Sequence, residues 1–305
     1  MKKDKNSLIS AVVGAGLVAG AALLGRKRKA ENKHQVPVPA PVITLETELK
    51  QRLTEFIEQD RFSLVIQPVV DFRDNTVSSG EALARLHHPE LGVIFPDDFL
   101  PMVDTMGLYP RFDRYIFRKC CAWMSSTLAE RETFHSLSCN FSRKTLSEAN
   151  LAGDLIQIAD RYGVPHNVLA IEITERERET DVCQFVDNLK QLKEAGFRIF
   201  LDDYGNGVTS VNDLMQYPLD VVKIDRSLLL KADTEQGAAN FLALVSTAKG
   251  LGAEVVCEGI ETAKQDRFAR DSGCHYGQGF LYFKPMGQSQ VFEKLHKCSI
   301  LEDNI

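Results

Sequence analysis

Short apolar runs alternate with longer helix-like segments from about Glu48 to Lys297, and this alternation is the strongest constraint on the fold. Eight runs predict strands, at residues 63–70, 77–86, 136–140, 168–173, 198–202, 221–224, 254–257 and 279–283. The intervening segments predict helices, among them residues 111–128, 148–162, 180–195, 235–251 and 262–271, and Gly163, Gly196 and Gly252 stand where helices should end. Strands that alternate with helices indicate a mainly parallel α/β sheet. Eight strands in about 250 residues favour a closed (β/α)8 barrel over an open doubly wound sheet.

Charge is distributed unevenly along the 305 residues. Residues 1–34 hold eight Lys or Arg and two Asp or Glu, whereas the remainder holds 28 basic and 40 acidic residues. An acidic body argues against binding a nucleic-acid polymer, which depends on basic surfaces. The seven cysteines form no CxxC pair, so we interpret them as reduced thiols of a cytosolic body.

The N-terminal segment at residues 7–25 is uncharged, apolar and flanked by Lys and Arg. Its length predicts a single transmembrane anchor that contacts the lipid bilayer; a cleaved signal peptide and a buried soluble helix are the alternatives. The larger basic cluster follows the span, which places the body on the cytoplasmic side of a bacterial inner membrane. We therefore expect a basic tail at 1–6, a basic and Pro-rich linker at 26–47, a folded body at 48–298 and a tail at 299–305.

Polar side chains follow nearly every predicted strand, at the barrel end where active sites lie. Each one alone has an ordinary explanation as a helix cap, a turn residue or a solvated side chain. Together they bring five carboxylates, one amide and one lysine to one barrel mouth. The repulsion between the carboxylates there requires counter-ions. Oxygen ligands of this kind suit Mg²⁺ or Mn²⁺, and two such ions can clamp a phosphodiester and activate a water. These residues are Glu81, Asn140, Glu172, Asp202, Asp203, Lys223 and Glu258.

Seven short motifs follow one another along the chain: EALAR at 81–85, CNFS at 139–142, EITE at 172–175, DDYGNG at 202–207, KID at 223–225, EGIET at 258–262 and QG at 278–279. In this order they resemble the motifs of the EAL family of cyclic di-GMP phosphodiesterases. The resemblance covers roughly Glu48 to Lys297. It implies an EAL-type modified (β/α)8 barrel with one antiparallel strand, and metal-dependent hydrolysis of cyclic di-GMP to linear pGpG.

The same resemblance implies a role for each matching residue. Glu81, Asn140, Glu172 and Asp202 would hold one divalent metal, and Asp202, Asp203 and Glu258 would serve the second. Lys223 would orient the nucleophilic water or a phosphate oxygen, Glu258 is also a candidate general base, Glu261 would position neighbouring groups, and Glu175 would steady a loop. Gln67, Arg85 and Gln278 match positions that contact the substrate.

The loop at residues 204–211 departs from the family pattern, with YGNGVTSV where FGTGYSSL is usual. Family members use this loop for dimer contact and metal-site support. The resemblance therefore implies a homodimer, and we expect the altered loop to affect the rate of hydrolysis. A catalytically weak cyclic di-GMP receptor and a membrane-bound signalling scaffold are the alternative functions.

Overall fold

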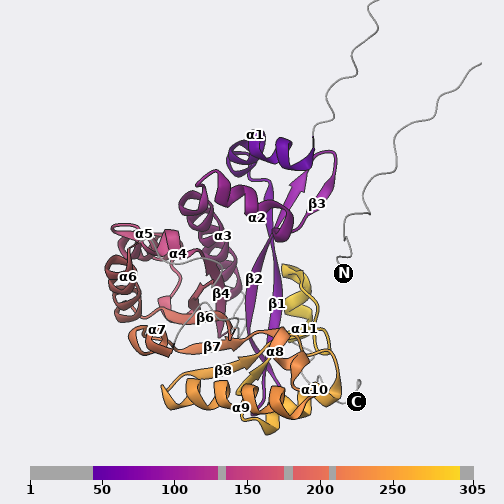
Figure 1. Ribbon diagram of the computed structural model, residues 1–305. Coiled ribbons are helices and arrows are strands. Elements are labelled where there is room, and N and C mark those ends of the chain that lie inside the picture. Colours follow the sequence, from indigo (N-terminus) through magenta and orange to yellow (C-terminus); the bar gives the residue numbers. More distant parts are fainter. Residues whose placement is uncertain (1–43, 130–134, 175–180, 206–210, 296–305) are drawn as a thin grey trace, which may run out of the picture. The chain divides into compact units, whose positions relative to one another are not determined.

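The computed structural model describes residues 44–129, 135–174, 181–205 and 211–295. Within these ranges eight strands close into a barrel (Figure 1). The strands are β1 (Phe62–Asp71), β2 (Val77–His88), β4 (Ser136–Phe141), β5 (Leu169–Ile173), β6 (Arg198–Tyr204), β7 (Val221–Ile224), β8 (Glu254–Cys257) and β9 (Tyr276–Gly277). Closure occurs because β1 pairs with both β2 and β9.

Strand direction follows the expected pattern. Every neighbouring pair from β2 round to β9 is parallel, whereas β1 is antiparallel to both of its neighbours. Two short strands lie outside the barrel: β3 (Gly92–Ile94) pairs with the end of β2, and β10 (Met286–Gly287) pairs with β1. The predicted barrel with one antiparallel strand is therefore confirmed.

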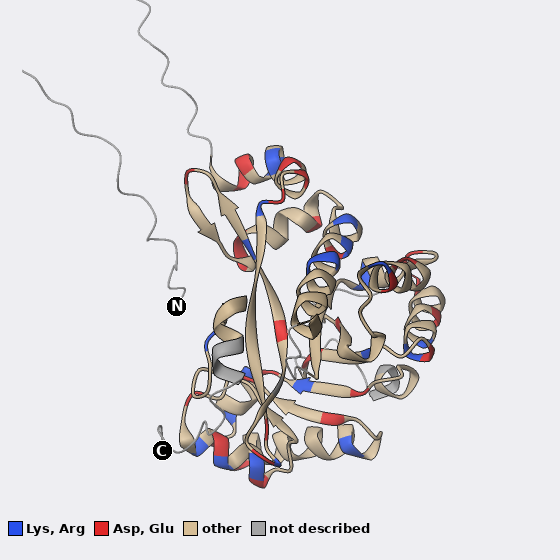
Figure 2. Cartoon of the chain, turned by 180° about the vertical axis from the view of Figure 1, so that it is seen from behind, with Lys and Arg blue, Asp and Glu red and all other residues tan. Residues whose placement is uncertain are grey.

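Helices connect the strands and cover the outside of the barrel. They are α1 (Leu45–Glu58), α2 (Pro96–Thr105), α3 (Tyr109–Ala129), α4 (Arg143–Leu146), α5 (Leu151–Tyr162), a 3₁₀ turn (His166–Val168), α6 (Val182–Glu194), α7 (Val211–Gln216), α8 (Arg226–Lys231), α9 (Glu235–Gly250), α10 (Ala263–Asp271) and α11 (Gln288–Leu295). Gly163, Gly196 and Gly252 all have positive φ at helix ends, as predicted. Charged residues lie mainly on these helices, whereas most of the strand ribbon is tan (Figure 2).

Two apolar layers stabilise this arrangement. The larger lies between the barrel and its helices. The smaller consists of Val69, Ala170, Phe200, Val221, Val256 and Tyr276. Alternate strand residues share a face, so the residue two positions after each of the last five lies on the same face, nearer the C-terminal end of the barrel. Those residues are Glu172, Asp202, Lys223, Glu258 and Gln278. An apolar layer thus lies directly below the polar residues that the sequence singles out.

An aromatic cluster fixes α2 and α3 against the start of β1. The ring centroid of Phe62 lies 5.3 Å from that of Phe99 and 5.2 Å from that of Phe112, and the last two are 5.7 Å apart. Edge-to-face pairs of this kind contribute about 0.5–1.5 kcal/mol each beyond the area that they bury. The beginning of α2, which carries Phe95 as its N-cap, is thereby held beside the long β1–β2 ribbon (Figure 1).

The predicted last strand at residues 279–283 is wrong. That segment is a turn in which the amides of Tyr282 and Phe283 both donate to the carbonyl of Gly279, and the barrel strand is β9, three residues earlier. A Cβ at Gly279 would lie 2.1 Å from the carbonyl oxygen of Ile260, so the turn packs directly on that backbone. Tyr282 and Phe283 are buried in this turn. Buried aromatic residues are also typical of strands, so the composition of the segment resembles that of a strand.

The predicted location in the inner membrane is contradicted. The described part of the chain contains no helix that combines the length and the apolar character needed to cross a membrane. Residues 7–25, on which that prediction depended, lie outside the described residues, as do the predicted tails at 1–6 and 299–305 and the linker up to residue 43. Backbone contacts divide the chain at Val42, and all described residues belong to the second unit, residues 43–305.

Candidate active site

Lys223 lies among four carboxylates at the C-terminal end of the barrel. Its Nζ is 2.6 Å from Glu172 Oε1, 2.7 Å from Glu258 Oε1, 2.9 Å from Glu81 Oε2 and 3.3 Å from Asp202 Oδ1. The side chains of Lys223 and Glu172 are 3% and 0% exposed. These residues come from β2, β5, β6, β7 and the residue after β8, so closure of the barrel is what brings them together.

Glu81 is the most extensively hydrogen-bonded of the four. Asn140 Nδ2 donates to its Oε1 at 2.8 Å, and Gln278 Nε2 donates to its Oε2 at 2.9 Å. Although burial opposes ionisation, Lys223 and these amide donors lower the pKa of Glu81 below its ordinary value. Glu81 is therefore an anchored carboxylate with a fixed orientation.

The other three carboxyl groups have raised pKa values. Burial, together with the charges of Glu81 and Asp202, raises the pKa of Glu172 to about 8 despite Lys223. Burial and like charges also raise the pKa of Asp202 and of Glu258. Burial alone would lower the pKa of Lys223, but the surrounding carboxylates raise it well above its ordinary value. The site thus contains more carboxyl groups than one ammonium can keep ionised.

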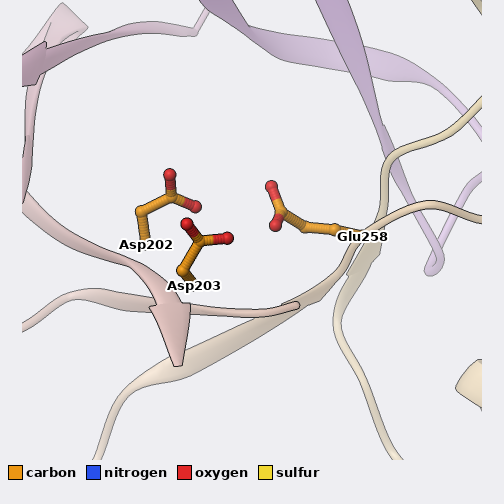
Figure 3. A group of neighbouring side chains, drawn as sticks. All are labelled: Asp202, Asp203 and Glu258. Carbon is orange, nitrogen blue, oxygen red and sulfur yellow. The ribbon is translucent and has the colours of Figure 1, made fainter. Parts of the chain in front are cut away.

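A β-bulge directs two consecutive aspartates to the same place. The β6–β7 register passes from Leu201–Val222 to Tyr204–Ile224, which leaves one extra residue on β6. Asp203 has φ 53°, in the left-handed region. A regular strand would turn Asp203 away from Asp202, because adjacent residues face opposite sides. The bulge instead brings one oxygen each of Asp202, Asp203 and Glu258 within 4.8 Å of one another (Figure 3).

These residues fit divalent cations. Three buried oxygens, Glu172 Oε2, Asp202 Oδ1 and Gln278 Oε1, have no hydrogen-bond partner among the described residues, although Asp202 Oδ1 is within ion-pair distance of Lys223. Five carboxylates and an amide oxygen at Asn140 are the hard donors that Mg²⁺ and Mn²⁺ prefer. Bound cations would also favour the ionised forms of the carboxyl groups whose pKa values are raised.

Two clefts adjoin the carboxylates, and Glu81 and Leu83 line both. The first is largely apolar and includes Pro96, Phe99 and Phe112 along with Asp202 and Asp203. The second is more open and is lined by Gln67, Glu81, Leu83, Arg226, Glu258, Gly259, Glu261, Gln278, Gly279 and Phe280. A ligand larger than a single phosphate therefore has room on both sides of the carboxylate cluster.

Three other predicted residues lie outside the group of carboxylates around Lys223. Glu261 is at the rim, where Arg226 Nη2 donates to it at 2.8 Å. Gln67 Nε2 donates to the carbonyl of Phe283 at 3.4 Å in the second cleft. Arg85 lies beyond the barrel on the end of β2. Glu175 and residues 206–210 of the altered loop lie outside the described residues.

The sequence reasoning missed Arg226. Its side chain packs over Gly259, where a Cβ would lie 2.2 Å from Arg226 Cγ. Gly259 has φ +67°, a conformation that favours glycine. Its position in the sequence could have indicated it, because Arg226 immediately follows Asp225 after the C-terminal end of β7.

Comparison with known proteins agrees with this geometry. Residues 50–285 match the model of the EAL domain. The cyclic di-GMP phosphodiesterase NbdA of Pseudomonas aeruginosa is 29% identical over 254 residues, which are 83% of this chain and 32% of that protein. The probable cyclic di-GMP phosphodiesterase PdeB of Escherichia coli K12 is 31% identical over 235 residues, 77% of this chain and 45% of that protein. This chain thus spans less than half the length of either relative.

A solved structure of the PaMucR phosphodiesterase in complex with c-di-GMP has a similar fold. Its TM-score is 0.74 at 29% sequence identity, and the match covers 80% of this chain and 99% of that chain. The family match includes all eight strands of the barrel that holds the carboxylates. The chain belongs to the EAL domain family.

Proposed function

We propose that this chain hydrolyses cyclic di-GMP to linear pGpG with two divalent ions, Mg²⁺ or Mn²⁺. The observation that carries the proposal is the cluster of Glu81, Glu172, Asp202 and Glu258 around Lys223, with Asp203 added by the bulge. The relatives named as cyclic di-GMP phosphodiesterases support the choice of substrate.

We assign the ions to the hard oxygen donors. Glu81, Asn140, Glu172 and Asp202 would hold one ion, and Asp202, Asp203 and Glu258 the other. When bound, the ions would polarise the phosphodiester and lower the pKa of a water molecule. Lys223 keeps its charge and can donate to a phosphate oxygen, because its pKa is raised by the carboxylates around it.

Hydrolysis to pGpG breaks one P–O3′ bond. Water supplies the new oxygen on phosphorus, one of its protons leaves to a base, and the 3′ oxygen takes up a proton. Glu258 is our candidate base, because its side chain is 16% exposed at the mouth whereas that of Glu172 is fully buried. Glu261 and Arg226 form an ion pair at the rim and are proposed to position neighbouring groups, and Gln67, Arg85 and Gln278 to contact the substrate.

We further propose that residues 48–298 form the catalytic domain and that the protein acts as a homodimer. The family match at residues 50–285 supports the first proposal. The apolar side chains of Val182, at the start of α6, and Met215, near the end of α7, are 51% and 67% exposed and support a self-association surface. Light scattering at several protein concentrations tests the dimer.

The test of the activity uses the full chain with cyclic di-GMP, in Mg²⁺, in Mn²⁺ and in EDTA, followed by chromatography. Metal-dependent formation of pGpG is expected. Asp202→Asn should abolish it, whereas Glu235→Gln on the outer helix α9 is a matched carboxyl-to-amide control that should not. Binding without product would favour the receptor function, and neither binding nor product in a folded sample would favour the scaffold.

A further inference from the structure

The end of β2 projects beyond the barrel. β2 pairs with β4 only as far as Ala82, and from there it continues beside β1 and then β3. Arg85 lies on this extension. It shares a strand face with Glu81 and Leu83, because the three are two residues apart. At about 3.3 Å per residue, the backbone of Arg85 is about 13 Å from that of Glu81, within the span of a dinucleotide.

Arg85 is held without a carboxylate. Its Nη1 donates to the carbonyl of Ala84 at 2.8 Å, and its Cζ lies 4.8 Å from the ring centroid of Phe95. Among the residues that the structure describes, no Asp or Glu forms an ion pair with Arg85, although most other arginines in these ranges have such a partner. A guanidinium stays charged across the physiological range, so its remaining N–H groups are available to an anion.

Phe95 is an exposed aromatic residue with a fixed backbone. It is the N-cap of α2, with the rigid Pro96 after it, and its carbonyl accepts the amide of Asp98 at 3.0 Å. More than half of Phe95 is exposed, at 54%, so burial of the ring does not explain its position. Its contact with Arg85 does, because the face of an aromatic ring attracts a cation. The next residue, Pro96, already lines the apolar cleft beside Glu81.

We propose that Phe95 is a positioning residue that holds the Arg85 guanidinium by a cation–π contact and so presents it to a phosphate oxygen of the substrate. This inference rests on the proposed function. A carboxylate in place of the ring would occupy the guanidinium fork and cancel its charge. The ring restricts the long side chain of Arg85 and leaves its charge and its donors intact. Phe95 therefore acts on substrate binding through Arg85, not on the chemical step.

The test is a double-mutant cycle in the full chain. Phe95→Leu keeps an apolar side chain but removes the ring, and it should raise KM for cyclic di-GMP about 2- to 5-fold with kcat unchanged. Phe95→Trp, which keeps an aromatic ring at this position, should have the wild-type KM, and a merely structural role would not predict this. In an Arg85→Ala background, Phe95→Leu should leave KM unchanged. Leu91→Ala, at a residue 56% exposed in the turn between β2 and β3, is the control for loss of exposed apolar surface.

Two outcomes would overturn the proposal. An equal rise of KM in both backgrounds would mean that Phe95 contacts the substrate directly, and no rise in either would mean that the ring has no role. An NMR measurement separates this question from the proposed function. The Arg85 Nε–H proton should show an upfield ring-current shift that is lost in Phe95→Leu. If the wild type neither binds nor hydrolyses cyclic di-GMP, the proposed function fails, and this shift still decides whether Phe95 holds Arg85.

Discussion

Replacing Lys223 by Met should expose how much of the barrel's stability depends on cations at its mouth. The ammonium lies within 3.3 Å of four carboxylates and is almost fully buried. Methionine has a similar length and no charge, so the change removes the central cation with little loss of volume. The carboxylate of Glu81, which stays ionised because its pKa is lowered, is then left without its ion-pair partner.

Removing one partner of a buried ion pair typically costs about 3–5 kcal/mol, because the remaining charge stays desolvated. For a domain of this size, this loss lowers Tm by roughly 6–20 °C. We expect the full loss in EDTA. Millimolar Mg²⁺ or Mn²⁺ should recover part of it, since cations that bind the native carboxylates stabilise the folded state by mass action.

Urea unfolding followed by circular dichroism measures this difference, with each protein in EDTA and in Mn²⁺. Lys264→Met is the matched control: Lys264 is 2.6 Å from Asp233, but its side chain is 79% exposed. An exposed pair contributes little, so its loss should stay within about 0.5 kcal/mol in either buffer. A Lys223→Met loss as small as that of the control, or one that Mn²⁺ does not reduce at all, would refute the reasoning.

Single substitutions at Asp203, Asp113 and Gly279 test three other features of the structure. Asp203→Gly should stabilise the fold by about 1 kcal/mol, because it removes the strain of a non-glycine residue at φ 53°, yet it should lower metal-dependent hydrolysis. Unfolding and activity assays on one preparation test this, and a change of stability and activity in the same direction would contradict it. Burial raises the pKa of Asp113 to about 7, although Thr145 and Ser142 donate hydrogen bonds to it. The contribution of Asp113 to stability is therefore lost as pH rises from about 4 to 7. Asp113→Asn should reduce the pH dependence of the unfolding free energy by up to about 4 kcal/mol between pH 4 and pH 8, and an unchanged dependence would count against this reasoning. Gly279→Ala should destabilise the protein by about 1–3 kcal/mol in urea, because its Cβ would meet the Ile260 backbone at 2.1 Å; a neutral effect would mean that the turn can shift.

The positions of most barrel strands could be predicted from the sequence because strand formation is a local property. β7 and β8 begin and end at the predicted residues, and β1, β2, β4, β5 and β6 differ by at most two residues at either end. The last strand could not be predicted. Residues 279–283 have a strand-like composition, but the Ile260 backbone, nineteen positions before Gly279, fixes them as a turn.

The sequence also determined which residue types meet at the barrel mouth. In a parallel barrel the C-terminal strand ends converge, so Glu172, Asp202 and Glu258 had to be neighbours once the strands were assigned. Only the tertiary structure decided how they meet. The bulge that turns Asp203 beside Asp202, the ammonium of Lys223 between four carboxylates, and the ring of Phe95 against Arg85 all depend on side-chain directions. Those directions are set by contacts between segments distant in sequence, and the local pattern of one strand contains no information about them.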